Sequence, residues 1–215
     1  MKEFIYSNTA YFWPMDRLVT EHYDGLQANA TLIMGVANNA IFLNSSHMEI
    51  LPNGNMPVKN TSFHSFTLSM WIRITNSSGS VLTLVLSRAY QLSLYYHSAE
   101  PNYLEVNLTE TDVAANSSCR RRHYRLHLLP DIFFHTVFTW NGDDLLFYKN
   151  SEKRPVYQDD ILDDLQCPSD LLANVSTKLV LFPGIAIDDI AVWLTALKRT
   201  NISNTFKRYS KSRTR

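Results

Sequence analysis

The sequence predicts an all-β protein built as an antiparallel sandwich or jelly roll, and three observations support this. Apolar and polar residues alternate in many short runs, as expected for strands with one buried face. These runs recur at spacings near ten residues, with turn-forming residues between them, which is typical of sandwiches and jelly rolls. Helical periodicity is scarce. The chain has 215 residues, 45% of them hydrophobic, so we expect one domain with one large core.

The clearest predicted strand runs from Phe66 to Ile74, where every second residue is large and apolar. Shorter runs of similar character precede and follow it, and turn-rich segments separate them. In chain order the predicted strands are Tyr11–Met15, Ala40–Leu43, Phe66–Ile74, Val81–Ser87, Gln91–Tyr96, Tyr103–Leu108, Tyr124–Leu129, His135–Trp140, Leu145–Lys149, Lys178–Phe182 and Ile187–Trp193.

One turn and one helix stand out in the sequence. Asn141-Gly142 lies between two strand patterns, and Asn-Gly predicts a tight hairpin because both positions tolerate positive φ. A short helix is predicted from residue 200 onward, because Ile202, Phe206 and Tyr209 would share one face.

The domain is predicted to span residues 11–206, with a lead-in at 1–10 and a basic tail or linker at 207–215. Twenty acidic and twenty basic residues leave no net charge, so we expect neither a nucleic-acid partner nor attraction to an anionic membrane. No stretch approaches the ~20 apolar residues of a spanning helix, so direct membrane insertion is not expected. Any signal peptide or anchor is expected outside this chain.

Glycosylation sequons indicate an extracellular or cell-surface protein. Eight of the seventeen asparagines begin an Asn-X-Ser/Thr sequence, whereas the composition predicts about three by chance. This excess favours passage through the secretory pathway. The predicted acceptors are Asn29, Asn44, Asn60, Asn76, Asn107, Asn116, Asn174 and Asn201.

The two cysteines, Cys119 and Cys167, are predicted to form one disulfide in an oxidising compartment. Such a bond would stabilise the fold by roughly 4 kcal/mol on the chain-entropy model. The alternative is a pair of buried free thiols in a cytosolic protein. The sequence has no CxxC motif and no Cys/His cluster, so structural zinc is not expected.

Four arginines, Arg120, Arg121, Arg122 and Arg125, form a candidate site for an anionic ligand such as a sulfated glycan. We expect the first three to lie in a loop beside the polar face of a strand. The alternative, which we favour, is a solvated edge that discourages strand pairing.

The weak candidates for a metal site are Asp159, Asp160 and Asp188, since calcium prefers oxygen ligands. For Asp159 and Asp160 a solvated loop is the preferred interpretation, and no cofactor other than calcium is indicated. Tryptophans can stack on sugars, but at strand spacing they are more often core residues. We therefore expect Trp13, Trp71, Trp140 and Trp193 in the core.

Four segments carry a family resemblance. They are Tyr11-Phe-Trp-Pro-Met-Asp16, Phe66-Thr-Leu-Ser-Met-Trp-Ile72, the hairpin His135-Thr-Val-Phe-Thr-Trp-Asn-Gly-Asp-Asp-Leu-Leu-Phe-Tyr-Lys-Asn150, and Ile187-Asp-Asp-Ile-Ala-Val-Trp193 followed by Ala196-Leu197. In order and spacing they resemble the laminin G-like and pentraxin group of concanavalin A-like jelly rolls. The nearest likeness is to pentraxin-like modules of adhesion G-protein-coupled receptors, and polycystin-like proteins are similar. The resemblance implies that one carboxylate of the Asp188-Asp189 pair hydrogen-bonds neighbouring backbone.

The resemblance implies an extracellular recognition or adhesion module that binds a protein or glycan, within a larger receptor or a secreted protein. A calcium-dependent lectin is the first alternative, although Tyr157-Gln-Asp-Asp160 lacks the glutamate of the pentraxin calcium cluster. A degenerate glycosidase-like domain is the second. Glu105 and Glu110 would point to opposite faces of one strand, so paired catalytic carboxylates are not evident and we expect no enzyme activity. The oligomeric state is not indicated.

Overall fold

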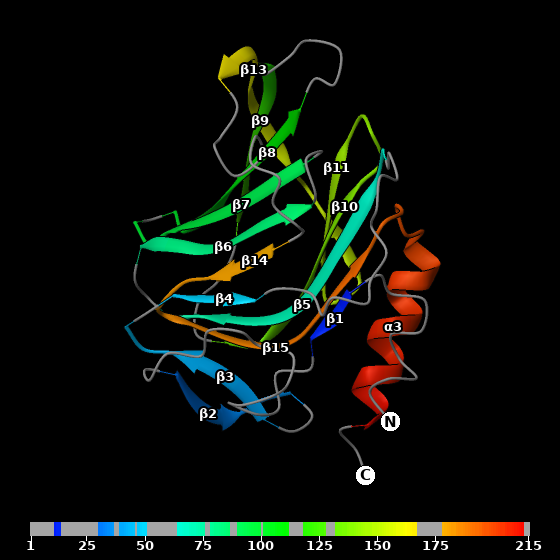
Figure 1. Cartoon of the computed structure of the whole chain (residues 1–215). Coiled ribbons are helices and arrows are strands. Elements are labelled where there is room, and N and C mark those ends of the chain that lie inside the picture. The colour runs from blue at the N-terminus through cyan, green and yellow to red at the C-terminus, as the bar shows by residue number, and fades with distance from the viewer. Residues whose placement is uncertain are drawn as a thin grey trace.

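The computed structural model describes residues 11–13, 30–36, 39–45, 47–50, 64–75, 78–86, 90–99, 101–111, 118–127, 132–166 and 178–212. The side chains of residues 11, 13, 118, 160–166 and 208–212 lie outside that description. Within the described residues the chain forms two antiparallel sheets and one helix (Figure 1).

In this part of the chain the first sheet has eight strands, and β5 (Phe66–Ile74) runs through its middle. The other strands, in spatial order, are β12 (Glu152–Arg154), β11 (Leu145–Lys149) and β10 (Phe134–Trp140) on one side of β5, and β15 (Ile185–Trp193), β3 (Asn39–Leu43) and β2 (Ala30–Met34) on the other, with β1 (Tyr11–Trp13) also paired to β15.

The second sheet has seven strands within the same residues, and its central strands pair in hairpin order. In spatial order they are β13 (Tyr157–Gln166), β9 (Ser118–His127), β8 (Tyr103–Thr111), β7 (Tyr90–His97), β6 (Gly79–Leu86), β14 (Lys178–Leu181) and β4 (Met48–Ile50).

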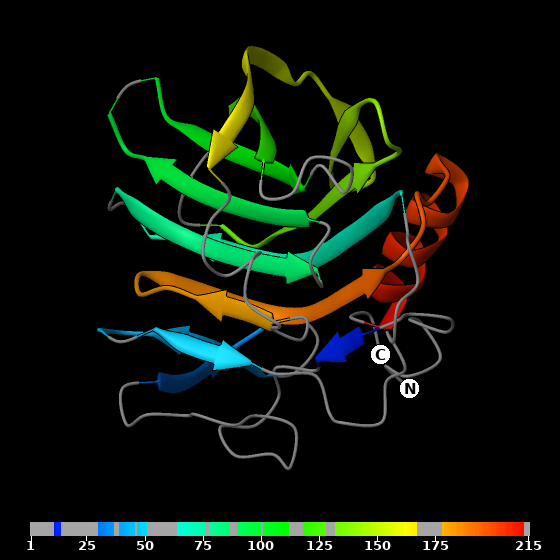
Figure 2. The same cartoon turned by 45° about the horizontal axis from the view of Figure 1, so that its top comes forward.

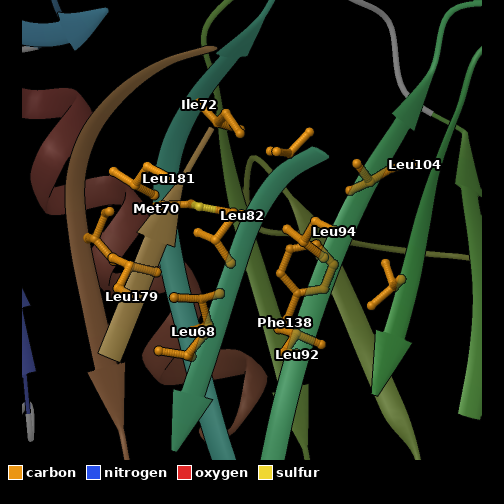
Figure 3. Close-up of a cluster of buried hydrophobic side chains, with 14 of the residues drawn as sticks. Leu68, Met70, Ile72, Leu82, Leu92, Leu94, Leu104, Phe138, Leu179 and Leu181 are labelled. Carbon is orange, nitrogen blue, oxygen red and sulfur yellow. The ribbon is translucent and has the colours of Figure 1, made fainter. Parts of the chain in front are cut away.

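The core lies between the two sheets. Figure 3 shows side chains of β5 and β10 pointing toward those of β6, β7, β8 and β14, for example Met70 and Phe138 toward Leu82 and Leu94. All these side chains are almost fully buried. Removing this apolar surface from water is the main term that stabilises a sandwich, at roughly 25 cal/mol per Å².

The helix α3 (Arg199–Ser212) packs on the outer face of the eight-stranded sheet (Figure 2). Ile202 is buried against Val137 and Tyr148, and the ring of Phe206 stacks on Trp71 at 5.8 Å. The helix continues beyond residue 206 into the segment that the sequence predicts as a tail. No helix in the described part of the chain is long and apolar enough to cross a membrane.

The predicted all-β sandwich is confirmed, and each predicted strand overlaps a strand of the structure. Two predicted loops are wrong. Arg120–Arg122 lie within β9, which begins at Ser118, and Asp159 to Asp164 lie within β13. The charged residues of both segments hide the alternation that identifies a strand. In the structure β13 is an edge strand and pairs with β9.

Candidate functional site

The outer face of the seven-stranded sheet, turned away from the core, carries the main cluster of polar and aromatic side chains in the described residues. It arises because β7, β8 and β9 alternate, with leucine and valine toward the core and longer polar residues toward solvent. We call it the polar–aromatic face. It consists of Tyr95, His97, Tyr103, Glu105, Asn107, His123, Arg125, Tyr157 and Asp159.

Strand register brings these residues together from distant parts of the sequence. Tyr95, Glu105, Arg125 and Tyr157 occupy one row across β7, β8, β9 and β13. In neighbouring rows His97 faces Tyr103, and Asn107 faces His123. Side chains directly opposite on antiparallel strands have Cβ atoms about 4.5–5.5 Å apart, so the rows form one continuous surface.

Glu105 is the centre of the face. One carboxylate oxygen, Oε2, lies 2.9 Å from His97 Nε2, and the other, Oε1, accepts a hydrogen bond from Asn107 Nδ2 at 2.8 Å. His123 Nε2 lies 3.3 Å from the same Oε1. Partial burial alone would raise the pKa of Glu105, but the hydrogen bonds from His97 and Asn107 and the nearby His123 lower it overall. The carboxylate is therefore held ionised and in a fixed orientation.

Asp159 anchors the other side of the face. Its Oδ2 lies 2.7 Å from Arg125 Nε and 3.2 Å from His123 Nδ1. His123 thus bridges two carboxylates, one on β8 and one on β13. A β-bulge between Gln158 and Asp160 interrupts the register of β13 at this point. Bulges re-aim side chains, which accounts for Asp159 reaching both partners on β9.

Aromatic rings border this polar network. His97 stacks on Tyr103 at 4.3 Å with an interplanar angle of 14°, and Tyr95 contacts His97 at 4.6 Å. The Arg125 guanidinium lies 5.6 Å from the centre of the Tyr103 ring. Tyr95 is 37% exposed and Tyr157 55%, so both rings are accessible from solvent.

Flat rings beside fixed donors and acceptors are suited to recognition. Rings can cover the apolar side of a ligand, while carboxylate, imidazole and guanidinium groups bond its hydroxyls or charges. The described residues contain no group of three or more His, Cys, Asp or Glu side chains arranged to hold a metal ion. The face is therefore a candidate site for binding a polar ligand.

The four predicted arginines do not form one patch. Because side chains alternate along β9, Arg120 and Arg122 share a face with core residues, and Arg121 and Arg125 lie on the other. Arg122 Nε lies 3.3 Å from Glu110 Oε2, and its guanidinium is 4.9 Å from the centre of the Trp140 ring. Arg121 lies on the same side of the sheet as Arg125 but outside the cluster, so Arg125 is the one of these four arginines that belongs to the polar–aromatic face.

The basic and acidic segments face each other within the fold. β13, which carries Asp159 and Asp160, pairs with the strand that carries the arginines, and Asp160 is opposite His123. Opposite charges on neighbouring strands stabilise the pairing. Part of the basic charge that was expected to bind an anionic ligand is therefore balanced by acidic residues of the same chain, as in the Arg125–Asp159 pair.

Asp188, the third metal candidate, hydrogen-bonds backbone. Its Oδ2 accepts a hydrogen bond from the Val36 N–H at 3.0 Å, and its side chain is fully buried. It lies in the middle of β15, where a β-bulge places Asp189 at a φ of 46°. This arrangement agrees with the backbone-pinning role that the resemblance implies for one of the two aspartates.

A buried pair on the other sheet has the composition of a nucleophile and its base. Ser69 Oγ lies 2.7 Å from His135 Nε2, and both side chains are buried. Residues of α3, including Ile202 and Thr205, close over them, and the space between has no room for a water molecule. The pair fixes β5 to β10 and has no access for a substrate.

Three of the eight predicted glycosylation sites are in the described residues. Asn44 is exposed at a bend after β3, and Asn201 is exposed in the first turn of α3. Asn107 lies in the middle of β8, on the polar–aromatic face. Asn29, Asn60, Asn76, Asn116 and Asn174 lie outside the described residues, as does Cys167. Cys119 is buried in β9, and its bond to Cys167 stays a prediction.

A second candidate region is a shallow hollow of about 410 Å³ at one end of the sandwich. Its lining includes Asn44, Ser80 and Phe182. No charged side chain lines it and no ion pair crosses it among the residues that line it. It offers fewer specific contacts than the polar–aromatic face.

Most residues of the face are absent from the sequence-based candidates. Alternation was the available signal: Tyr103, Glu105 and Asn107 are two residues apart, as are Tyr95 and His97. These positions form the polar side of their strands. The alignment of β7, β8, β9 and β13 that unites them depends on strand register, which the local pattern does not contain.

Comparisons with solved structures find similar folds. Similar structures are the binding domain of botulinum neurotoxin serotype D (13% identity, TM-score 0.58, covering 94% of this chain and 51% of that one) and the botulinum neurotoxin DC binding domain in complex with SialylT (14%, 0.60, 95% and 52%). The DC binding domain in complex with rat synaptotagmin II is also similar (14%, 0.55, 84% and 46%). The chain thus spans about half the length of these domains. No family model and no curated protein matches the sequence.

At such low identity the likeness shows a shared fold: this chain is a β-sandwich of the kind found in these binding domains.

Proposed function

We propose that this chain is a recognition module that binds a glycan on the polar–aromatic face. The observation that carries the proposal is the Glu105-centred network, in which the carboxylate is held by His97, Asn107 and His123 beside accessible tyrosine rings. A sugar presents hydroxyls along its edge and C–H groups on its faces, and the site offers a partner for each.

The fold supports a binding role without identifying the ligand. The neighbours include a domain solved with SialylT and one solved with rat synaptotagmin II, so related sandwiches occur in proteins that bind a glycan or a protein. These two ligands are named for domains about twice as long as this chain. Sandwich sheets supply a rigid frame, and specificity comes from the residues mounted on it.

The proposed setting is extracellular or on the cell surface, as part of a larger receptor or a secreted protein. The excess of glycosylation sequons supports this setting, and the exposed positions of Asn44 and Asn201 are compatible with attached sugars. A disulfide between Cys119 and Cys167 is part of the same proposal.

Binding to immobilised oligosaccharides, half ending in sialic acid and half in neutral sugars, tests the proposal. Tyr95→Ala and Tyr157→Ala should each weaken binding at least about tenfold, because truncated aromatic anchors commonly cost 1.4 kcal/mol or more. Met34→Ala is the matched control, since Met34 is 87% exposed on β2 of the other sheet. Binding that Tyr95→Ala and Tyr157→Ala leave unchanged would exclude this face.

The same assay separates the alternative ligands. The calcium-dependent alternative requires that a chelator abolish binding. Absence of binding to every oligosaccharide, with retention of a protein from the cell surface, would indicate a protein partner in place of a glycan.

A further inference from the structure

We propose that an N-linked glycan on Asn107 blocks the polar–aromatic face, so that chains left bare at this asparagine are the ones that bind ligand. The inference rests on the proposed function of the face and adds a means of controlling it. It follows from where one sequon falls in the folded chain.

The atom that would carry the sugar lies at the centre of the network. Asparagine is glycosylated at Nδ2. In Asn107 this nitrogen is 2.8 Å from Glu105 Oε1, the same oxygen that lies 3.3 Å from His123 Nε2. The first sugar would therefore begin beside the carboxylate that holds the site together.

The rest of the face surrounds this point. Asn107 is opposite Ser93 on β7 and His123 on β9, and the next row holds Tyr95 and Arg125. Neighbouring strands lie about 4.8 Å apart and diagonal residues about 7–8 Å apart. These distances are within reach of the first sugars of a glycan, so the attached chain would cover the surface that a free ligand needs.

Among the described residues, the part of the face beside Asn107 that holds Arg125 and Tyr95 is open to solvent. Arg125 has a 53% exposed side chain and Tyr95 is 37% exposed. The face is covered at Thr109, two residues along the same side of β8, but open at Arg125 and Tyr95, so a glycan on Asn107 would lie over the open part and leave the core intact.

The glycan must be attached to Asn107 before the chain folds. The sequon also needs the hydroxyl of Thr109, and Thr109 is only 3% exposed within β8, which is paired on both sides. Transfer from a lipid diphosphate-linked oligosaccharide forms a bond between sugar C1 and Nδ2 of Asn107. It breaks the bond between C1 and the diphosphate, and one amide proton leaves. Occupancy is thus fixed during synthesis, and the folded chains would form two stable populations.

The other two described sequons lie away from the polar–aromatic face. Asn44 and Asn201 are exposed, and neither lies on β7, β8, β9 or β13. Glycans at Asn44 and Asn201 should leave ligand binding on the face unchanged, which makes Asn107 distinct among the sequons in the described residues.

The test compares three proteins made in secreting cells: the unchanged chain, Thr109→Val and Thr109→Ser. Valine has nearly the shape of threonine and keeps Asn107, but it removes the acceptor sequence. Serine retains it. Mass spectrometry reports occupancy of Asn107, thermal unfolding reports folding, and the oligosaccharide panel described above reports binding.

We expect Thr109→Val to bind at least tenfold more tightly than chains of the unchanged protein that carry sugar on Asn107, and Thr109→Ser to behave like the unchanged protein. Equal binding by occupied and bare chains would overturn the inference and leave the proposed function standing. So would an Asn107 that is bare in every secreted molecule. If neither form binds any oligosaccharide, the proposed function itself fails. Should Thr109→Val not fold, Thr109→Ala removes the same acceptor sequence without changing Asn107 and is judged by the same outcomes.

Discussion

At the scale of single residues, His135 makes the stability of the fold depend on pH. It is completely buried under α3, and burial lowers its pKa to about 3. The native state therefore keeps it neutral, whereas in the unfolded chain it takes up a proton below about pH 6.5. Because the unfolded state binds the extra proton, stability falls as the pH drops from 6.5 toward 3.

We predict that His135 makes the protein about 2 kcal/mol less stable at pH 5 than at pH 7. His135→Gln should remove that part of the pH dependence, because glutamine does not titrate yet can still hydrogen-bond Ser69. Denaturant unfolding of both proteins at the two pH values measures it. An identical loss of stability in both would show that other groups cause the pH dependence.

Gly35 is a second position where a single added atom should change the stability of the fold. A Cβ added there would lie 2.7 Å from Asp188 Oδ2 and 2.8 Å from the backbone carbon of Asn39. The carboxylate cannot yield easily, because its Oδ2 also accepts the Val36 N–H.

Gly35→Ala should therefore destabilise the protein by about 1–3 kcal/mol, the usual cost of overpacking. Gly79→Ala is the control, since nothing lies within 4 Å of the added carbon. Denaturant unfolding compares the two, and equal effects would contradict the close packing around Asp188.

At the scale of elements, α3 is held to the sheet by few but well-buried contacts. Ile202 is 1% exposed against Val137 and Tyr148. Ile202→Ala should cost about 2–5 kcal/mol, as cavity-forming changes do. Asn204→Ala, on the exposed side of the helix, should change stability by no more than about 0.5 kcal/mol. If the unfolding curves of both variants match the unchanged protein, α3 does not contribute to the folded domain.

The elements also show which features of a sequence specify a strand. Phe66–Ile74 is predicted with its observed bounds, because an apolar stripe at period two leaves one interpretation. β9 is predicted only from Tyr124 onward and β13 is missed entirely, because runs of charged residues obscure the alternation that identifies a strand. Their complementarity, arginines on one and aspartates on the other, was visible in the sequence. It would have predicted that the two segments pair.

At the scale of the whole molecule, the site depends on how strands align. Tyr95, Glu105, Arg125 and Tyr157 span more than sixty positions of sequence, yet they form one row. A shift of β8 by one residue would turn Glu105 toward the core. The fold class therefore follows from local alternation, whereas the site requires the register of four strands, which only the assembled sheet defines.

The most direct test maps the ligand onto the sheet. NMR spectra of the labelled protein, bare at Asn107 and titrated with the strongest-binding oligosaccharide of the panel, report which residues change. We predict that the largest shifts fall on Tyr95, His97, Glu105, His123 and Arg125. Shifts confined to the hollow lined by Asn44, Ser80 and Phe182, with β8 unchanged, would contradict the assignment of this face.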